Sequence, residues 1–120
     1  MKYALLIYDD QQAWGQLDEQ TRAGIYEEYG KFYSTMEEKG IMRGGEELQP
    51  TTTATTVRIR DGKTLTTDGP YAETKEQLGG FFLLECDNLD EAIDAAANIP
   101  SVKRGGIIEV RPIVEDQPHD

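Results

Sequence analysis

The sequence is short of the side chains on which many functional sites depend. Its 120 residues contain one cysteine, Cys86, and one histidine, His119. A lone cysteine excludes an intrachain disulfide and suits a reducing compartment, so we expect Cys86 to be a small core residue. The spacing of a zinc site is missing, and no ligand pattern indicates another metal or a cofactor. We therefore expect neither a metal nor a cofactor.

Positive charge and long apolar runs are scarce as well. Twelve Lys and Arg against 23 Asp and Glu give a formal net charge of −11. This balance repels phosphate backbones and anionic lipid surfaces, so we expect no direct binding to nucleic acid or to a membrane. No run approaches the ~20 apolar residues of a membrane span, and the first ten residues do not resemble a signal peptide. The expected location is the cytoplasm.

What the sequence does contain is an alternation of strand and helix patterns. The runs Tyr3–Tyr8 and Phe81–Cys86 are apolar at both alternating sets of positions, which is typical of strands covered on both faces. Apolar residues at spacings of three and four predict an amphipathic helix from an N-cap at Asp18 to about Lys39. A chain of this length fits one domain, which we place at residues 1–114, before a flexible polar tail at 115–120.

Turn and capping signals predict the other elements. Asp61-Gly62 separates two β-rich runs and indicates a hairpin, while Asn88, three residues before Glu91, indicates the start of a second helix. The hairpin strands are expected at 55–60 and 63–67, a weaker strand at 41–48, the last strand at 107–114 and a loop at 9–15. The buried stripe of the second helix is expected at Leu89, Ala92, Ile93 and Ala96.

The order of these elements predicts an α+β fold. A β-α-β unit, an inserted hairpin and a second β-α-β unit are typical of the ferredoxin-like split βαβ sandwich, in which two helices cover one face of an antiparallel sheet. Its first and third core strands lie in the middle, and these are the two runs that are apolar on both faces. Because an apolar sheet face is a liability in a monomer, we expect a homodimer in which a second copy covers it.

One segment, from Asp68 to Gly80, has no regular periodicity and yet is dense in functional side chains. Asp-Gly-Pro at 68–70 predicts a rigid turn, because Asp bonds its own backbone, glycine accepts a positive φ and proline fixes the next φ. Either this turn presents a binding site, or it ends the hairpin and a solvated charge run follows. The candidate binding residues here are Tyr71, Glu73, Thr74, Lys75 and Glu76.

The string DGPYAETKEQLGGFFLLE closely resembles the hallmark of the DGPF branch of the YCII-related family, with Tyr71 in place of the usual Phe. The resemblance includes MKYALLIYDD, TTVRIRDGKTLTTDGP and GGIIEVRPI, and so spans nearly the whole chain. It implies a ferredoxin-like dimeric α+β barrel. It also implies a largely unassigned function: similar proteins are often associated with extracytoplasmic-function sigma factors, and a few relatives act as lyases on small ring compounds.

The resemblance further implies where a reaction would occur. The wider family is thought to use a His–Asp pair in a cleft near the dimer interface, and Asp68 looks like the Asp of that pair. The His has no clear counterpart, since His119 lies in the tail. The first helix offers Tyr26, Glu28 and Tyr29 instead. Catalysis would then need Asp68, Glu73 or Glu76 together with a tyrosine, and the carboxylate would have to be desolvated to work near neutral pH.

Two further candidates lie outside this segment. Arg111 alternates with apolar residues on the last strand and is expected on the sheet face away from the helices, where it would form an inter-subunit ion pair or clamp a substrate carboxylate. Tyr8 ends a central strand nearby. Its hydroxyl would donate a hydrogen bond to a ligand, or its ring would simply be part of the core.

Two functions therefore stay open. The first is a small-molecule enzyme or ligand-binding domain whose pocket lies at the 68–76 loop near the dimer interface. The second is a non-catalytic regulatory or interaction module associated with a sigma factor.

Overall fold

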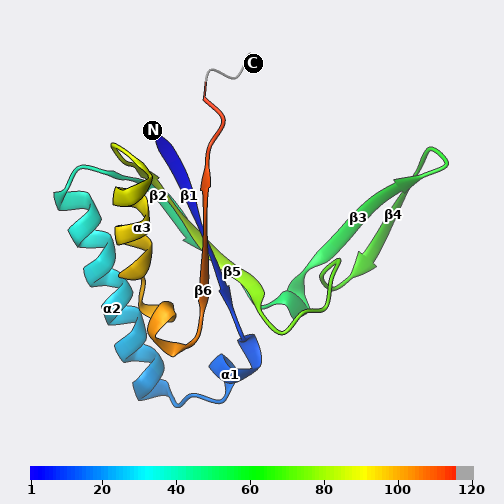
Figure 1. The fold of residues 1–120 in the computed structure, drawn as a ribbon. Helices are drawn as coiled ribbons and strands as arrows, with labels where there is room; N and C mark the ends of the chain where they lie inside the picture. The colour runs from blue at the N-terminus through cyan, green and yellow to red at the C-terminus, as the bar shows by residue number, and fades with distance from the viewer. Residues whose placement is uncertain (116–120) are drawn as a thin grey trace.

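The computed structural model describes residues 1–115 as a four-stranded antiparallel sheet with helices and a separate hairpin (Figure 1). The strands are β1 (Lys2–Asp9), β2 (Met42–Glu47), β3 (Thr55–Arg60), β4 (Lys63–Asp68), β5 (Gln77–Glu85) and β6 (Ile107–Pro112). The helices are α1 (Gln11–Gly15), α2 (Glu19–Glu38) and α3 (Leu89–Ala97), with the 3-10 turns η1 (Thr51–Thr53) and η2 (Pro100–Arg104). No helix within the described residues is long and apolar enough to cross a membrane.

The main sheet has the strand order β2-β5-β1-β6. Its two central strands, β1 and β5, are the ones whose sequences are apolar on both faces, and all neighbours pair antiparallel. This arrangement confirms the α+β prediction and is consistent with a ferredoxin-like topology. Strand β5 begins at Gln77 rather than at Phe81, because the ladder continues through a bulge opposite the Ile7–Tyr8 step.

The two longer helices begin where capping residues predict. The Asp18 carboxylate accepts a hydrogen bond of 2.7 Å from the Thr21 amide, and the Asn88 side chain accepts one of 2.9 Å from the Glu91 amide. The Glu91 carboxylate in turn accepts from the amide of Asp87, one position before the residue that a capping box would use. Local signals thus place both helix starts correctly.

The expected loop at 9–15 is wrong, because most of it forms the short helix α1. Asp10 explains the difference: its carboxylate accepts hydrogen bonds of 3.0 and 3.3 Å from the amides of Gln12 and Ala13. These bonds satisfy donors that a helix start otherwise leaves free.

The expected buried stripe of α3 is correct only for its small residues. Leu89 and Ile93 are about half exposed, whereas Ala92, Ala95 and Ala96 are buried against the sheet. The alanine side of the helix is narrow, so it lies close to the strands and leaves the larger side chains on the outer surface.

The core lies between the helices and one face of the sheet. Tyr3, Leu5 and Ile7 point into it from alternate positions of β1, and Phe32 of α2 packs among them. Cys86 is buried in the same cluster, which confirms its expected place in the core, and burial raises the pKa of its thiol. The thiol is therefore protonated and unreactive at neutral pH.

The opposite face of the sheet is not covered by any described helix (Figure 1). The register places Leu6 beside Phe81 and Glu109 on this face, and Leu83 and Arg111 follow at the next position. The three apolar side chains are only partly buried. The sheet therefore has an uncovered apolar face, with Arg111 on it as the strand alternation predicted.

Strands β3 and β4 pair only with each other. In Figure 1 helices α2 and α3 lie to the left of the main sheet and this hairpin extends to the right. Its turn places Asp61 at φ 53° and Gly62 at φ 74°, the two positive values for which an Asp-Gly sequence is suited. The predicted hairpin is therefore present. The expected tail at 115–120, with His119, lies outside the described residues apart from Glu115.

Candidate functional site

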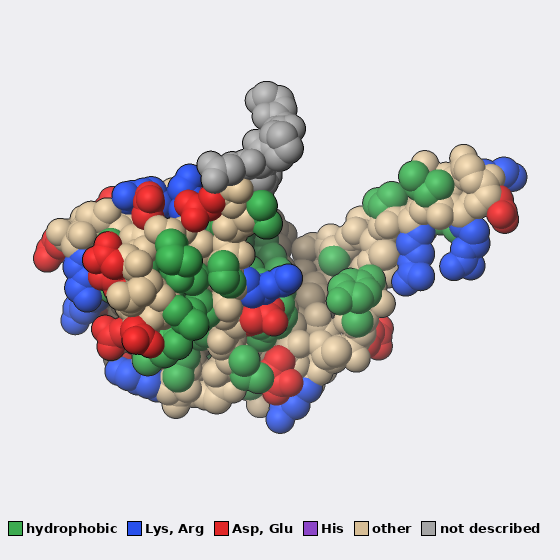
Figure 2. Space-filling model, turned by 45° about the horizontal axis from the view of Figure 1, so that its top comes forward, with side chains coloured by type: hydrophobic (Ala, Val, Ile, Leu, Met, Phe, Trp, Pro, Cys, Tyr) green, Lys and Arg blue, Asp and Glu red, His purple; other side chains and the backbone are tan. Residues whose placement is uncertain are grey.

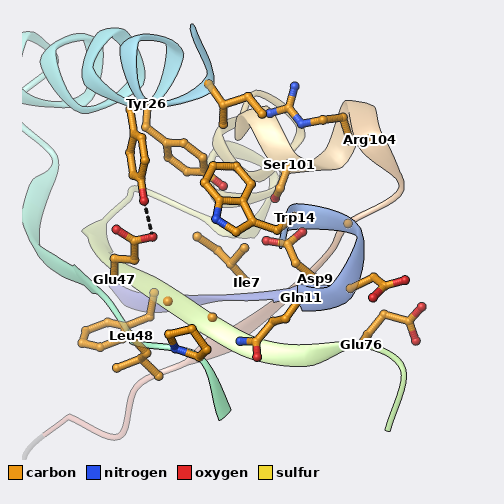
Figure 3. Close-up of a pocket in the computed structure, with 18 of the residues that line it drawn as sticks. Ile7, Asp9, Gln11, Trp14, Tyr26, Glu47, Leu48, Glu76, Ser101 and Arg104 are labelled. Carbon is orange, nitrogen blue, oxygen red and sulfur yellow. Dashed lines mark hydrogen bonds between the residues drawn. The ribbon is translucent and has the colours of Figure 1, made fainter. Parts of the chain in front are cut away.

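A cleft of about 1010 Å³ lies between α2 and the helix-facing side of the sheet (Figure 3). Its walls come from the end of β1, α1, α2, β2 with the segment after it, the start of β5 and η2. A volume of this size is at the upper end of the range of small-molecule sites. The cleft has an aromatic wall and a polar end.

Trp14 and Tyr26 form the aromatic wall. Their rings meet edge to face with centroids 5.6 Å apart and planes at 89°, a geometry that aromatic pairs favour. The Tyr26 hydroxyl donates a hydrogen bond of 2.9 Å to Glu47 Oε2, which links α2 to β2 (Figure 3). Burial and then the Glu47 carboxylate raise the pKa of Tyr26. The phenol therefore remains a hydrogen-bond donor at neutral pH.

The polar end of the cleft is built from Asp9, Tyr29, Ser101 and Arg104, which come from β1, α2 and η2. Asp9 follows the buried part of β1 and is itself partly buried. Burial raises the pKa of its carboxyl, and the positive charge of Arg104 opposes this rise. An aspartate with a raised pKa exchanges protons closer to neutral pH than an exposed one does.

Tyr29 responds electrostatically to the same group of residues. Burial gives the largest rise in the pKa of its phenol, and the Asp9 carboxylate raises it further. Ser101 and Arg104 act in the opposite direction. Asp9, Ser101 and Arg104, from two other elements, are therefore close enough to influence the protonation of Tyr29.

Ser101 is the buried polar residue of this end. It is 5% exposed, and its hydroxyl has no hydrogen-bond partner among residues 1–115. The hydroxyl affects the pKa of Tyr29, but the geometry of their approach falls short of a hydrogen bond. Figure 3 shows Ser101 close to Asp9 in the cleft. A buried hydroxyl without a partner costs about 1–3 kcal/mol, and Ser101 is one of the residues that line the cleft.

Gly106 provides the space that the Asp9 carboxyl occupies. A Cβ at this position would collide with Asp9 Oδ1 and would lie 2.8 Å from the Ser101 carbonyl oxygen. The Gly106 amide donates a hydrogen bond of 2.9 Å to that same carbonyl and closes the η2 turn. The sequence Gly105-Gly106 thus allows β1 and η2 to bring Asp9 and Ser101 together.

Two comparisons with known proteins cover nearly the whole chain. Residues 1–116 match the model of the YCII-related domain. An uncharacterized protein of Rhizobium meliloti (strain 1021) is 36% identical over 119 residues, which cover 98% of this chain and 96% of the relative. The chain belongs to the YCII-related family. The family-level resemblance is therefore confirmed, whereas its DGPF branch stays a prediction, and the name of the relative states no activity.

Besides Tyr26 and Tyr29, which the first helix offered in place of a histidine, the YCII-related chain brings only two of the expected site residues into the cleft. Lys75 and Glu76 line its outer part, close to the point where β5 begins. Neighbouring Thr74 is exposed and donates a hydrogen bond of 2.6 Å to the Glu76 carbonyl, which fixes the local backbone. Glu73 is exposed.

The other expected residues lie elsewhere. Asp68 is exposed at the end of β4 and does not line the cleft, and Tyr71 is 83% exposed. Tyr8 and Arg111 lie on the uncovered face of the sheet, where the Tyr8 hydroxyl donates a hydrogen bond of 3.4 Å to Glu109. The binding and catalytic roles that the sequence assigned to these residues stay predictions.

Several cleft residues were not expected from the sequence. Asp9 had a usable signal, because it is the first carboxylate after a buried strand. Tyr29 was not among the unexpected residues, since the first helix offered it, with Tyr26, in place of a histidine, and both line the cleft. Ser101 had none, since a serine after a proline is ordinary loop sequence. Within residues 1–115 no group of three or more His, Cys, Asp or Glu side chains stands close enough to hold a metal ion.

Proposed function

We propose that this YCII-related domain binds a small molecule in the cleft and that Asp9 exchanges a proton with it. The observation that carries the proposal is the Ser101 hydroxyl, which is buried without a partner beside a carboxyl whose pKa is raised by burial. Both features cost stability in the empty protein, and such costs are typical of functional sites.

The walls of the cleft favour a ring compound with an oxygen substituent. Trp14 and Tyr26 offer flat apolar surface to a ring, while the hydroxyls of Ser101 and Tyr29 offer hydrogen bonds to an oxygen atom. In proton abstraction, the Asp9 carboxylate would take a proton from the bound ligand. The electron pair left on the ligand oxygen would be stabilised by the two hydroxyls and by the positive charge of Arg104.

The dimer is a separate part of the proposal. A second copy of the chain would pack its sheet on the uncovered face that carries Leu6, Phe81 and Leu83. A two-fold axis lets identical apolar faces cover each other, which removes this surface from water. The association with a sigma factor rests on the resemblance alone.

A thermal-shift screen tests the ligand proposal. Wild type, Asp9→Asn, Ser101→Ala and Asp68→Ala would be heated with phenols, quinones, lactones and small carboxylates. A compound bound in the cleft should raise the melting temperature of wild type and of Asp68→Ala, because a ligand at 100 times its Kd stabilises the folded protein by about 2.7 kcal/mol. It should raise the melting temperature of Asp9→Asn and Ser101→Ala less, because these variants bind it more weakly.

Two other outcomes have clear meanings. A shift that disappears only in Asp68→Ala would place the ligand at the 68–76 loop and refute the cleft. If no compound shifts any protein while all melt cooperatively, small-molecule binding loses its support. A pull-down with a sigma factor would then test the interaction module.

A further inference from the structure

The β3–β4 hairpin, residues 55–68, which we name the arm, is exposed to an unusual degree. Its apolar residues Val57, Ile59 and Leu65 are all exposed, Ile59 to 75%. An isolated two-stranded hairpin is at best marginally stable in water, and its edges leave backbone groups unpaired. Figure 2 shows the arm extending from the body of the molecule with both hydrophobic and basic side chains on its surface. The arm thus has the properties of an element that lies against another surface.

The two faces of the arm differ in chemistry. The register places Val57 and Ile59 on one face, opposite threonines of β4. Arg58, Arg60 and Lys63 share the other face. Within the described part of the chain, none of these three cations forms an ion pair. A basic face therefore projects from a protein whose formal net charge is −11.

The exposed area points to a missing partner of considerable size. The chain exposes 8596 Å², whereas a compact monomer of 13.4 kDa exposes about 6,500 Å². The radius of gyration is 16.4 Å, against about 14 Å for a compact chain of this length. The excess area is on the order of 2,000 Å², and one partner in a standard protein interface buries about 800 Å².

We propose that the arm clasps a second copy of this chain and lays its basic face on carboxylates of that copy. Charge complementarity selects this partner, because the body of each copy is strongly acidic. Glu46 and Glu109 are exposed on or beside the uncovered sheet face and form no ion pair in the described residues. In a two-fold dimer each arm clasps the other body, so the same contact is made twice.

A phosphate backbone fits the arm less well. Three cations on a chain of this net charge give little gain from released counterions, and the acidic body repels the rest of a nucleic acid. Both ends of the arm also lead into the cleft: Leu48 and Pro50 precede it, and Lys75 and Glu76 follow it, and all four line the cleft. Docking of the arm on a second copy therefore fixes one wall of the cleft in each subunit.

Sedimentation equilibrium on charge-reversal variants tests the proposal. The test variant is Arg58→Glu/Arg60→Glu/Lys63→Glu. The control is Lys31→Glu/Lys39→Glu/Lys103→Glu, which changes the net charge equally on a surface beside α2. We expect the test variant to raise the dimer dissociation constant by about tenfold or more and the control to have a much smaller effect. Equal effects of the two variants, or a wild-type monomer at tens of micromolar, would overturn the proposal.

Hydrogen exchange distinguishes docking of the arm from pairing of the two sheet faces. In wild-type dimer, the amides of β3 and β4 should be protected, and they should lose protection in the test variant while β1 and β5 keep theirs. This readout also shows that the variant is folded. A wild-type dimer whose arm amides exchange as fast as those of an unstructured peptide would refute the clasp, even if the sheet faces pair.

Discussion

The Tyr26 hydroxyl donates a hydrogen bond of 2.9 Å to Glu47 Oε2 and so links helix α2 to the edge strand β2 across the cleft. Both side chains are exposed, so water can replace either partner when the bond is broken. The bond therefore positions the wall of the cleft more than it stabilises the fold.

Tyr26→Phe should leave the protein almost as stable as wild type. The ring still packs against Trp14, and the lost bond is an exposed one, so we expect a loss below about 1 kcal/mol in urea unfolding. Tyr33→Phe is the control, because Tyr33 also lines the cleft but donates no bond of this kind in the described structure. A loss above about 2 kcal/mol for Tyr26→Phe alone would show that the bond is structural.

Ser101→Ala should be neutral or stabilising, by up to about 1 kcal/mol, because the hydroxyl it removes is buried without a partner. The same variant should bind a cleft ligand more weakly. Urea unfolding measures the first effect and calorimetric titration with a compound from the thermal-shift screen the second. A clear loss of stability would mean that the hydroxyl forms a hydrogen bond in the ligand-free protein. Ser101 would then not be an unpaired donor available to a ligand.

The stability of Asp9→Asn relative to wild type should depend on pH. Burial raises the folded-state pKa of Asp9 above its unfolded value, so folding favours the protonated carboxyl. Below the unfolded pKa of about 3.9 both states are protonated and ionisation costs nothing. As pH rises through the folded pKa, wild type pays the cost of ionising a partly buried group and Asn does not.

We therefore expect Asp9→Asn to gain stability on wild type between acid and neutral pH, by less than about 1 kcal/mol because solvent screens the group. Unfolding in urea at a series of pH values measures this difference. Asp10→Asn serves as a control of the neighbouring position, because asparagine caps a helix about as well as aspartate, so this variant should stay close to wild type in stability. A pH-independent difference for Asp9→Asn would contradict the raised pKa.

Gly106→Ala should disturb the polar end of the cleft. The added Cβ would collide with the Asp9 carboxyl and with the backbone of η2, so we expect a loss of about 1–3 kcal/mol and weaker ligand binding. Gly24→Ala is the matched control: a Cβ there meets nothing, and alanine in a helix gains up to about 1 kcal/mol over glycine. If both variants behave alike, Gly106 does not hold Asp9 in place.

Much of the fold could be predicted because its signals are local. The caps at Asp18 and Asn88, the Asp61-Gly62 turn and the apolar pattern of β1 act over a few residues each. The signals that failed were also local but weaker. Asp10 caps a helix that is too short to show periodicity. In α3 the buried residues are alanines, which mark a buried face less clearly than the larger Leu89 and Ile93.

The site could be predicted only in part, because functional side chains that are close in the sequence need not be close in the folded protein. The 68–76 segment is crowded with functional side chains, yet of these only Lys75 and Glu76 line the cleft. Asp9, Tyr29 and Ser101 are far apart in the sequence and meet only when β1, α2 and η2 pack together. No local pattern could have indicated that the Ser101 hydroxyl would be buried without a partner.

The most direct test of the cleft is a chemical-shift titration of the ¹⁵N-labelled protein with phenol and with benzoate. We predict that the amides that move most are those of residues 7–14, 26–30 and 101–106, and that Ser101→Ala reduces these shifts. Shifts centred on residues 68–71, or no shifts at millimolar ligand, would contradict a binding site at Asp9 and Ser101.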